Sequence, residues 1–198
     1  MTVNRFTIQI LFGFFLATIF ACSNSHPETS QTRGKELSHI SSISFSDNKY
    51  QIDTTIILTN QNLASLINDI DNTILTTHNN KKDIPDFIKT FLESLTNDNF
   101  SIADPGEDWQ VSDVIFRPLP ARQLVYLGLG DDIALFTYFS GGIARSEHVL
   151  IFKFKDQKIT DFWSGNILFD LDNKNEIVGY LKKNKDKHFT LNTNIIYL

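Results

Sequence analysis

The segment "DIALFTYFS", residues 132–140, determines our interpretation of the fold. Its first apolar residues, Ile133 to Phe136, follow one another without a polar residue between them. Because successive side chains of a strand point to opposite faces, both faces of this strand would be apolar. Such a strand is typical of the centre of a sheet that is covered on both sides. The sequence therefore predicts a sheet with residues 132–140 at its centre.

Shorter segments on both sides of this strand also have the composition of β-strands. They are separated by turn signals, such as Asp104-Pro105-Gly106. The predicted strands are "FSIAD" (100–104), "VSDVIF" (111–116), "RQLVYLGL" (122–129), "HVLIFKF" (148–154) and "ITDFW" (159–163). Their close spacing predicts an antiparallel meander.

The residues before the meander predict one strand and two helices. Residues 50–59, "YQIDTTIILT", are rich in β-branched side chains and predict a strand. Apolar residues recur at helical spacing over residues 60–77 and again over residues 83–98. Asn60, or the threonine before it, is expected to cap the first helix, and Asp83 is expected to cap the second.

The residues after the meander predict a helix and a final strand. Asn173 and Glu176 have the spacing of a capping box, so we expect a helix rather than a hairpin over residues 173–185. "NIIYL", residues 194–198, predicts the last strand. The fold class that follows is α+β, with two N-terminal helices packed on a curled antiparallel β-meander.

This order of elements resembles the cone-shaped nuclear-transport-factor-like and cystatin-like folds. The segment "HVLIFKFKDQKITDFW", residues 148–163, looks like the final hairpin of those folds. The resemblance implies a cone-like or half-barrel-like domain, and it carries no implied catalytic residue.

The N-terminus has the layout of a secretory signal. Residues 1–21 carry one charge, Arg5, and the run from residue 6 to residue 21 is almost entirely apolar. A helix needs about 20 apolar residues to cross a membrane, so this run is short for an anchor. We interpret residues 1–21 as a signal peptide.

The end of this signal, "IFAC" (residues 19–22), resembles the lipobox of bacterial lipoproteins. The resemblance implies cleavage before Cys22 and lipidation of its thiol, which would attach the mature chain to a membrane. Ser23, in place of the aspartate that retains such proteins in the inner membrane, implies the outer membrane, and we favour its periplasmic face. The alternative is ordinary secretion with a free cysteine. In the lipoprotein interpretation, residues 22–41 comprise the lipidated cysteine and a flexible tether, and residues 42–198 form a single globular domain.

Composition excludes some classes of partner and chemistry. The formal net charge is −5, and it becomes −6 without Arg5, which argues against nucleic acid and anionic lipid surfaces as partners. The sequence contains no P-loop, no G-x-S-x-G and no H-E-x-x-H motif. We therefore predict no cofactor and no metal site.

Three residues are candidates for catalysis. His148 lies in a predicted strand beside Glu147, and it could act as a general base at the mouth of an apolar pocket. Asp113 is a further acidic candidate. The alternative role of His148 is a histidine at the edge of the core with one satisfied hydrogen bond.

Three arginines are candidates for ligand binding, because the sequence from residue 90 to residue 152 contains no lysine. They are Arg117, Arg122 and Arg145. Arginine offers a planar fork that pairs with two oxygens at once, on a ligand carboxylate or phosphate or on an aspartate such as Asp113 or Asp132. We expect at least one arginine to pair with an aspartate of the domain.

Two tryptophans, Trp109 and Trp163, complete the set of candidate binding residues. If exposed, they could stack on sugars or peptides, whereas at strand ends they would cover the core.

Two functions follow from these observations. The first is a lipid-anchored cell-envelope protein with a non-catalytic binding or interaction domain, attached to the membrane at Cys22, whose partner is an envelope protein or a small molecule. The alternative is a small pocket-bearing enzyme that uses His148 with aspartate or arginine partners. A filled core would favour the first function, and an open apolar cone would favour the second.

Overall fold

The computed structural model describes residues 50, 53–96, 99–115, 117–167, 170–187, 191 and 193. The chain divides into two units, residues 1–37 and 38–198, and every described residue lies in the second unit. The signal peptide, Cys22, the tether and the predicted strand 194–198 therefore lie outside the described residues, and their predictions stand as made.

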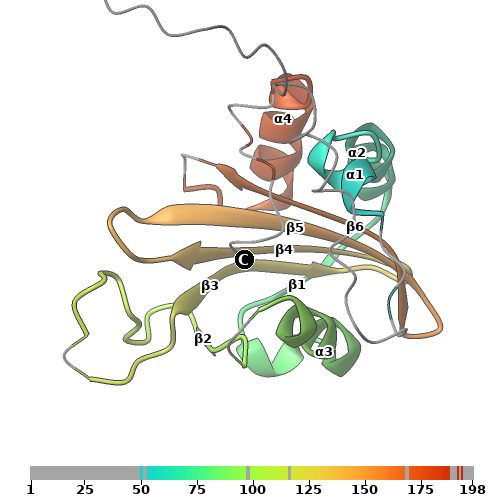
Figure 1. Cartoon of the computed structure of the whole chain (residues 1–198). Helices are drawn as coiled ribbons and strands as arrows, with labels where there is room; N and C mark the ends of the chain where they lie inside the picture. Colours follow the sequence, from blue (N-terminus) through green and yellow to red (C-terminus); the bar gives the residue numbers. More distant parts are fainter. Residues whose placement is uncertain are drawn as a thin grey trace, which may run out of the picture. The chain divides into compact units, whose positions relative to one another are not determined.

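The described residues form an α+β structure around an open six-stranded sheet (Figure 1). The strands pair in the order β1-β3-β4-β5-β6, and all of these pairs are antiparallel. The two-residue strand β2 pairs with β3 in parallel. The strands are β1 (Thr76–His78), β2 (Ile102–Ala103), β3 (Arg122–Leu129), β4 (Ile133–Ser140), β5 (Ser146–Lys155) and β6 (Lys158–Ile167).

Strand β4 is the centre of this sheet, as its sequence predicts. Phe136 lies opposite Leu127 of β3 and Leu150 of β5. Every residue from Ile133 to Tyr138 is buried, so both faces of the strand are covered. The prediction of a central strand is confirmed.

Helix α3 (Asp86–Leu95) covers one face of the sheet, which we call the α3 face (Figure 1). Aromatic rings form the contact: the centroid of Phe91 lies 6.0 Å from that of Phe152 and 5.1 Å from that of Phe162. Phe87 of the same helix meets Phe154 at 5.0 Å. These edge-to-face contacts fill the space under β5 and β6.

Helices α2 (Leu63–Asn72) and α4 (Lys174–Asn184) lie on the opposite face, which we call the α2 face (Figure 1). The short helix α1 (Thr54–Leu58) precedes them in the chain. The indole of Trp163 donates a hydrogen bond of 2.8 Å to Asn60 Oδ1, and Lys153 of β5 pairs with Asp69 of α2 at 2.5 Å. Polar contacts thus fix the position of α2 over the sheet.

The predicted strand at residues 50–59 is wrong, because residues 54–58 form α1. The carboxylate of Asp53 accepts hydrogen bonds from the amides of Thr55 (2.9 Å) and Ile56 (3.4 Å). This N-cap satisfies donors that a helix start leaves open, and it outweighs the strand preference of β-branched residues. The prediction of two N-terminal helices is therefore not confirmed, since α1, α2 and α3 all precede β3.

The two predicted helices are shorter than expected. α2 ends at Asn72, and residues 76 and 77, expected to be helical, belong to β1, which pairs with β3. Neither Asn60 nor Asp83 caps a helix, since Asn62 and Pro85 occupy the N-cap positions. Asp83 lies in the short 3₁₀ helix η1 (Lys81–Asp83).

The helix predicted at residues 173–185 is confirmed as α4. Its N-cap is Asn173, whose side-chain oxygen accepts a hydrogen bond of 3.0 Å from the amide of Glu176. The strand predicted at residues 111–116 is wrong for its described part, residues 111–115, where only a single bridge joins Ser112 to Gly142.

Candidate functional site

The turn between β4 and β5, residues 141–145, is joined to the loop that contains residues 109–115. The amide of Gly142 donates a hydrogen bond of 3.1 Å to the carbonyl of Val111, next to the bridge between Ser112 and Gly142. We call the two joined segments the hairpin end. Several of the predicted site residues lie here.

Glycine allows the two segments to come this close. A Cβ atom on Gly141 would lie 2.1 Å from the carbonyl oxygen of Gln110 and 2.5 Å from that of Val111. Gly142 has a φ of +136°, which side-chain-bearing residues rarely adopt. The pair Gly141-Gly142 is therefore required for the joined arrangement.

Three of the predicted binding residues lie at the hairpin end. Trp109 stacks on Phe139, with 6.4 Å between ring centroids, and the guanidinium carbon of Arg145 lies 4.3 Å from the centroid of the same Phe139 ring. Arg117 lies in the loop, where it forms an ion pair with Asp108. The predicted candidates Trp109, Arg117 and Arg145 are thus brought together in one region.

Four aliphatic side chains at the hairpin end are exposed to solvent, although their sequence pattern does not predict this exposure. Their exposed fractions are 53% for Val111, 53% for Val114, 72% for Ile115 and 99% for Ile143. We call these four residues the apolar end patch. The sequence does contain one sign of this exposure, because Ile143 is an isoleucine within the turn sequence "GGIAR", residues 141–145. A pocket of about 220 Å³ adjoins the patch, lined by Trp109, Gln110, Val111, Ser112, Val114, Arg117 and Leu119.

His148 lies on the α3 face and is buried. Its Nε2 atom lies 2.7 Å from Ser140 Oγ and 3.4 Å from Ser146 Oγ, and its ring stacks on Tyr138 at 4.8 Å. Burial lowers the pKa of His148 to about 4, and the nearby guanidinium of Arg122 acts in the same direction. The imidazole is therefore neutral at physiological pH.

Arg122, the remaining arginine candidate, is buried in the same region. Its guanidinium carbon lies 4.5 Å from the ring centroid of Phe100 and 5.8 Å from that of Tyr138. Such cation–π contacts stabilise a guanidinium away from water. Arg122 is therefore part of the packed α3 face.

Glu147 lies on the α2 face, because adjacent residues of a strand point to opposite faces. Its Oε2 atom accepts a hydrogen bond of 2.8 Å from the amide of Leu171. Burial raises the pKa of Glu147 to about 7, although the Leu171 hydrogen bond and the charge of Arg145 act in the opposite direction. Glu147 is thus a buried carboxyl group that titrates near neutral pH.

The three catalytic candidates do not converge. Glu147 and His148 are separated by the sheet, and Asp113 is exposed in the loop at the hairpin end. Trp163 is fully buried with its indole bound to Asn60, so it covers the core and does not offer a stacking surface.

The prediction that at least one arginine pairs with an aspartate is confirmed. Arg117 pairs with Asp108, and Arg145 pairs with Asp170. Neither pair uses Asp113 or Asp132, and Asp132 instead lies 3.5 Å from Lys153. Both arginine pairs are exposed, so each contributes about 0–1 kcal/mol to stability.

The comparisons with known proteins assign no family to this chain. Comparison with family models, with curated proteins and with solved structures gave no match. Among the described residues, no group of three or more histidine, cysteine or acidic side chains could hold a metal ion. Within the same residues, no helix has the length and apolar character needed to span a membrane.

Proposed function

We propose that the chain is a lipid-anchored cell-envelope protein whose globular domain binds a partner through the apolar end patch, without catalysis. The observation that carries the proposal is the exposure of Val111, Val114, Ile115 and Ile143 on two joined segments. The packed core between the sheet and its helices also favours a binding domain over an enzyme whose active site lies inside an open apolar cone.

When a partner covers exposed aliphatic side chains, the free energy of the complex is lowered, because apolar surface is removed from water. Complete burial of a valine or isoleucine side chain contributes about 1.5–3 kcal/mol. Single exposed apolar residues are common, but a group with polar residues around it marks an interaction site. Here the ion pairs Arg117–Asp108 and Arg145–Asp170 supply the polar surroundings.

The anchor is the second part of the proposal. Cys22 would carry the lipid, and Ser23 favours the outer membrane with the domain on its periplasmic face. Partners would then be proteins of the envelope rather than nucleic acid. The cone-like form implied by the fold resemblance stays a prediction.

The partner-binding part is tested by photo-crosslinking in the producing cell. A benzophenone amino acid at Ile143 should give one discrete crosslinked product, and the same group at Lys183, an exposed residue of α4, is the matched control. Ile115→Ser should weaken the product at position 143. Equal crosslinking from positions 143 and 183 would contradict the proposal.

The anchor is tested by intact-mass measurement of the membrane fraction. We expect a chain that begins at Cys22 and carries added acyl mass, and Cys22→Ser should leave the precursor uncut or release the protein. A wild-type chain that is soluble and cut at another position would overturn this part.

A small enzyme is the second candidate, and one contact favours it. The 2.7 Å separation of Ser140 Oγ from His148 Nε2 is that of a nucleophile and its base. However, a histidine whose pKa is lowered to about 4 is a weak base, and Glu147 lies on the other face. A fluorophosphonate probe decides the matter: we expect no labelling, and labelling of Ser140 that His148→Gln abolishes would favour the enzyme.

A further inference from the structure

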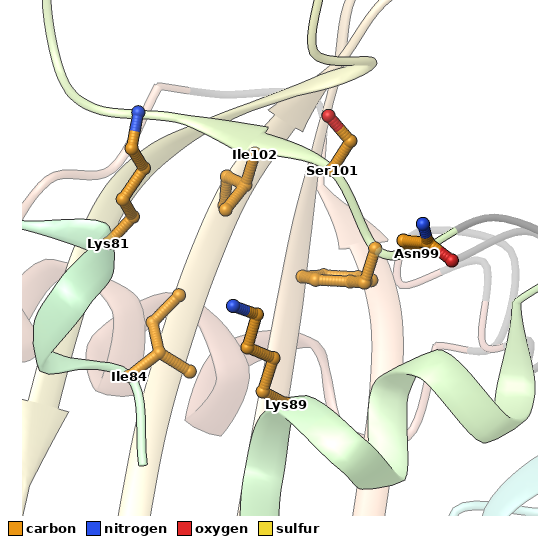
Figure 2. A pocket seen from close by; sticks show the side chains of 7 residues that line it. Lys81, Ile84, Lys89, Asn99, Ser101 and Ile102 are labelled. Carbon is orange, nitrogen blue, oxygen red and sulfur yellow. The ribbon is translucent and has the colours of Figure 1, made fainter. Parts of the chain in front are cut away.

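A second pocket lies between η1, α3 and the segment that leads into β2. Its volume is about 380 Å³, within the range of small-molecule sites, and it shares no lining residue with the apolar end patch. The lining residues are Lys81, Ile84, Lys89, Asn99, Phe100, Ser101 and Ile102 (Figure 2).

The pocket combines an apolar base with cationic and polar groups. Ile84, Phe100 and Ile102 are buried, and they present apolar atoms to the space. Lys89, Asn99 and Ser101 are exposed residues on its rim, and Figure 2 shows the ammonium group of Lys89 directed into the space beside Ile84. A pocket with an apolar base and a polar rim is suited to an amphipathic molecule.

The two lysines of the pocket differ in their partners. Lys81 is neutralised by Glu107 at 2.7 Å and lies 3.8 Å from Asp104. The ammonium group of Lys89 forms no hydrogen bond or ion pair within the described part of the chain, although Asp86 and Glu93 lie on the same helix. Lys89 is therefore the cation that is available to an incoming anion.

The backbone at the base of the pocket is strained. Phe100 has a φ of +41°, in the left-handed region that a bulky residue rarely adopts. Its ring is held by Arg122 at 4.5 Å and by Tyr138 at 5.4 Å. Strain of this kind persists only where the surroundings enforce it, and it is concentrated at binding sites.

We infer that this pocket binds an amphipathic anion, with its carboxylate or phosphate head at Lys89 and its apolar part on Ile84, Phe100 and Ile102. Asn99 and Ser101 would offer neutral hydrogen bonds elsewhere on the rim, since both side chains can act as donors and both are directed away from the Lys89 ammonium (Figure 2). A charge-assisted contact to Lys89 would be stronger than either of these neutral hydrogen bonds.

The test measures binding of octanoate to the complete chain in nanodiscs of uncharged lipid, with empty nanodiscs as the background. We expect saturable binding that falls about tenfold in Lys89→Gln, because one charge-assisted contact is lost. Lys183→Gln, on α4, is the matched control and should bind like the wild type. Octyl phosphate in place of octanoate distinguishes a phosphate from a carboxylate ligand.

Two further measurements keep the inference falsifiable. Octanamide has the same shape without the charge, and it should bind the wild type about tenfold more weakly than octanoate. Ser101→Trp should block the pocket and abolish binding while leaving the melting temperature unchanged, because residue 101 is exposed. Equal binding of octanoate and octanamide, equal losses in the two lysine variants, or no saturable binding would overturn the inference.

Discussion

The ladder between β4 and β5 places apolar side chains in two opposite situations. Within this ladder, far from the turn, Phe152 is fully buried between the rings of α3 and β6. In the turn that joins the two strands, at the hairpin end, Ile143 is 99% exposed. The side chains are similarly apolar, but only the first can stabilise the fold. Under the proposed function, the contribution of Ile143 would lie in binding.

This difference shows how to separate structural from functional apolar residues. Truncating a residue that stabilises the fold lowers the protein's free energy of unfolding. Truncating a residue that only binds a partner lowers the protein's affinity for that partner and leaves its stability unchanged. Measuring both the free energy of unfolding and the affinity of a variant therefore distinguishes the two kinds of residue.

The largest effect is expected at the centre. Phe91→Ala removes a ring that contacts Tyr50, Phe152 and Phe162, and it should lower the free energy of unfolding by about 3–5 kcal/mol. Urea unfolding measures this change. Ile143→Ala, at the hairpin end, should cost less than about 0.5 kcal/mol. Similar losses at both positions would remove the distinction between centre and end.

The second effect depends on pH and concerns Glu147. The folded state holds its proton up to a pKa of about 7, against 4.5 for the ordinary group, so it binds more protons than the unfolded state between these values. This contribution to stability therefore falls as pH rises from 4.5 to 7. Glu147→Gln should be more stable than the wild type at pH 8, by on the order of 2 kcal/mol, and equal to it below pH 4.5.

The pKa shift of His148 is opposite in sign to that of Glu147, so it changes stability with pH in the opposite direction and provides an internal check. Its folded pKa of about 4 lies below the ordinary 6.5, so the unfolded state binds more protons between these values, and stability falls as pH decreases from 6.5 to 4. In Glu147→Gln this slope should become visible in thermal unfolding. Glu176→Gln, at an exposed position on α4, is the matched control. An unchanged pH profile in Glu147→Gln would contradict the assignment.

The third effect concerns the attachment of the hairpin end. Gly141→Ala forces a Cβ against two carbonyl oxygens, and it should cost about 1–3 kcal/mol or detach the loop. Faster hydrogen exchange at the amide of Gly142 would report the detachment. Gly179→Ala is the control, because a Cβ there meets nothing within 4 Å and alanine favours the helix α4.

The smallest effect is expected at the exposed ion pairs. Arg117→Met and Arg145→Met should each lower the free energy of unfolding by less than about 1 kcal/mol, because both pairs are surrounded by solvent. Thermal unfolding at low and high salt measures this. A loss of several kcal/mol at either site would mean that the arginine is a structural residue rather than part of the surroundings of the patch.

The sequence was sufficient for the centre of the fold. Strands β3 to β6 lie where their apolar patterns predict, and α4 begins at the capping residue Asn173. In each case the local preference and the burial agree. The opposite orientation of Glu147 and His148 also follows from the two-residue period of a strand.

The strand predictions were wrong where a specific contact outweighed the strand preference of the amino-acid composition. The Asp53 cap turns a β-branched segment into α1, and the bridge to Gly142 holds residues 111–115 as a loop. The pocket at Lys89 was not predicted, because η1, α3 and β2 meet only in the folded chain. Contacts between segments far apart in the sequence leave no periodic pattern.

The way in which the hairpin end is fastened has a consequence for how this protein can diverge. The loop is held by main-chain hydrogen bonds. The amide of Gly142 donates to the carbonyl of Val111, and the amide of Gln110 donates to the carbonyl of Pro120 at 2.8 Å. Every residue type except proline supplies both of these groups, so side chains at positions 111, 114, 115 and 143 can be replaced without loosening the attachment. Selection could therefore change the chemistry of this surface through substitutions at these four positions, while the glycine pair and the sheet beneath stay fixed.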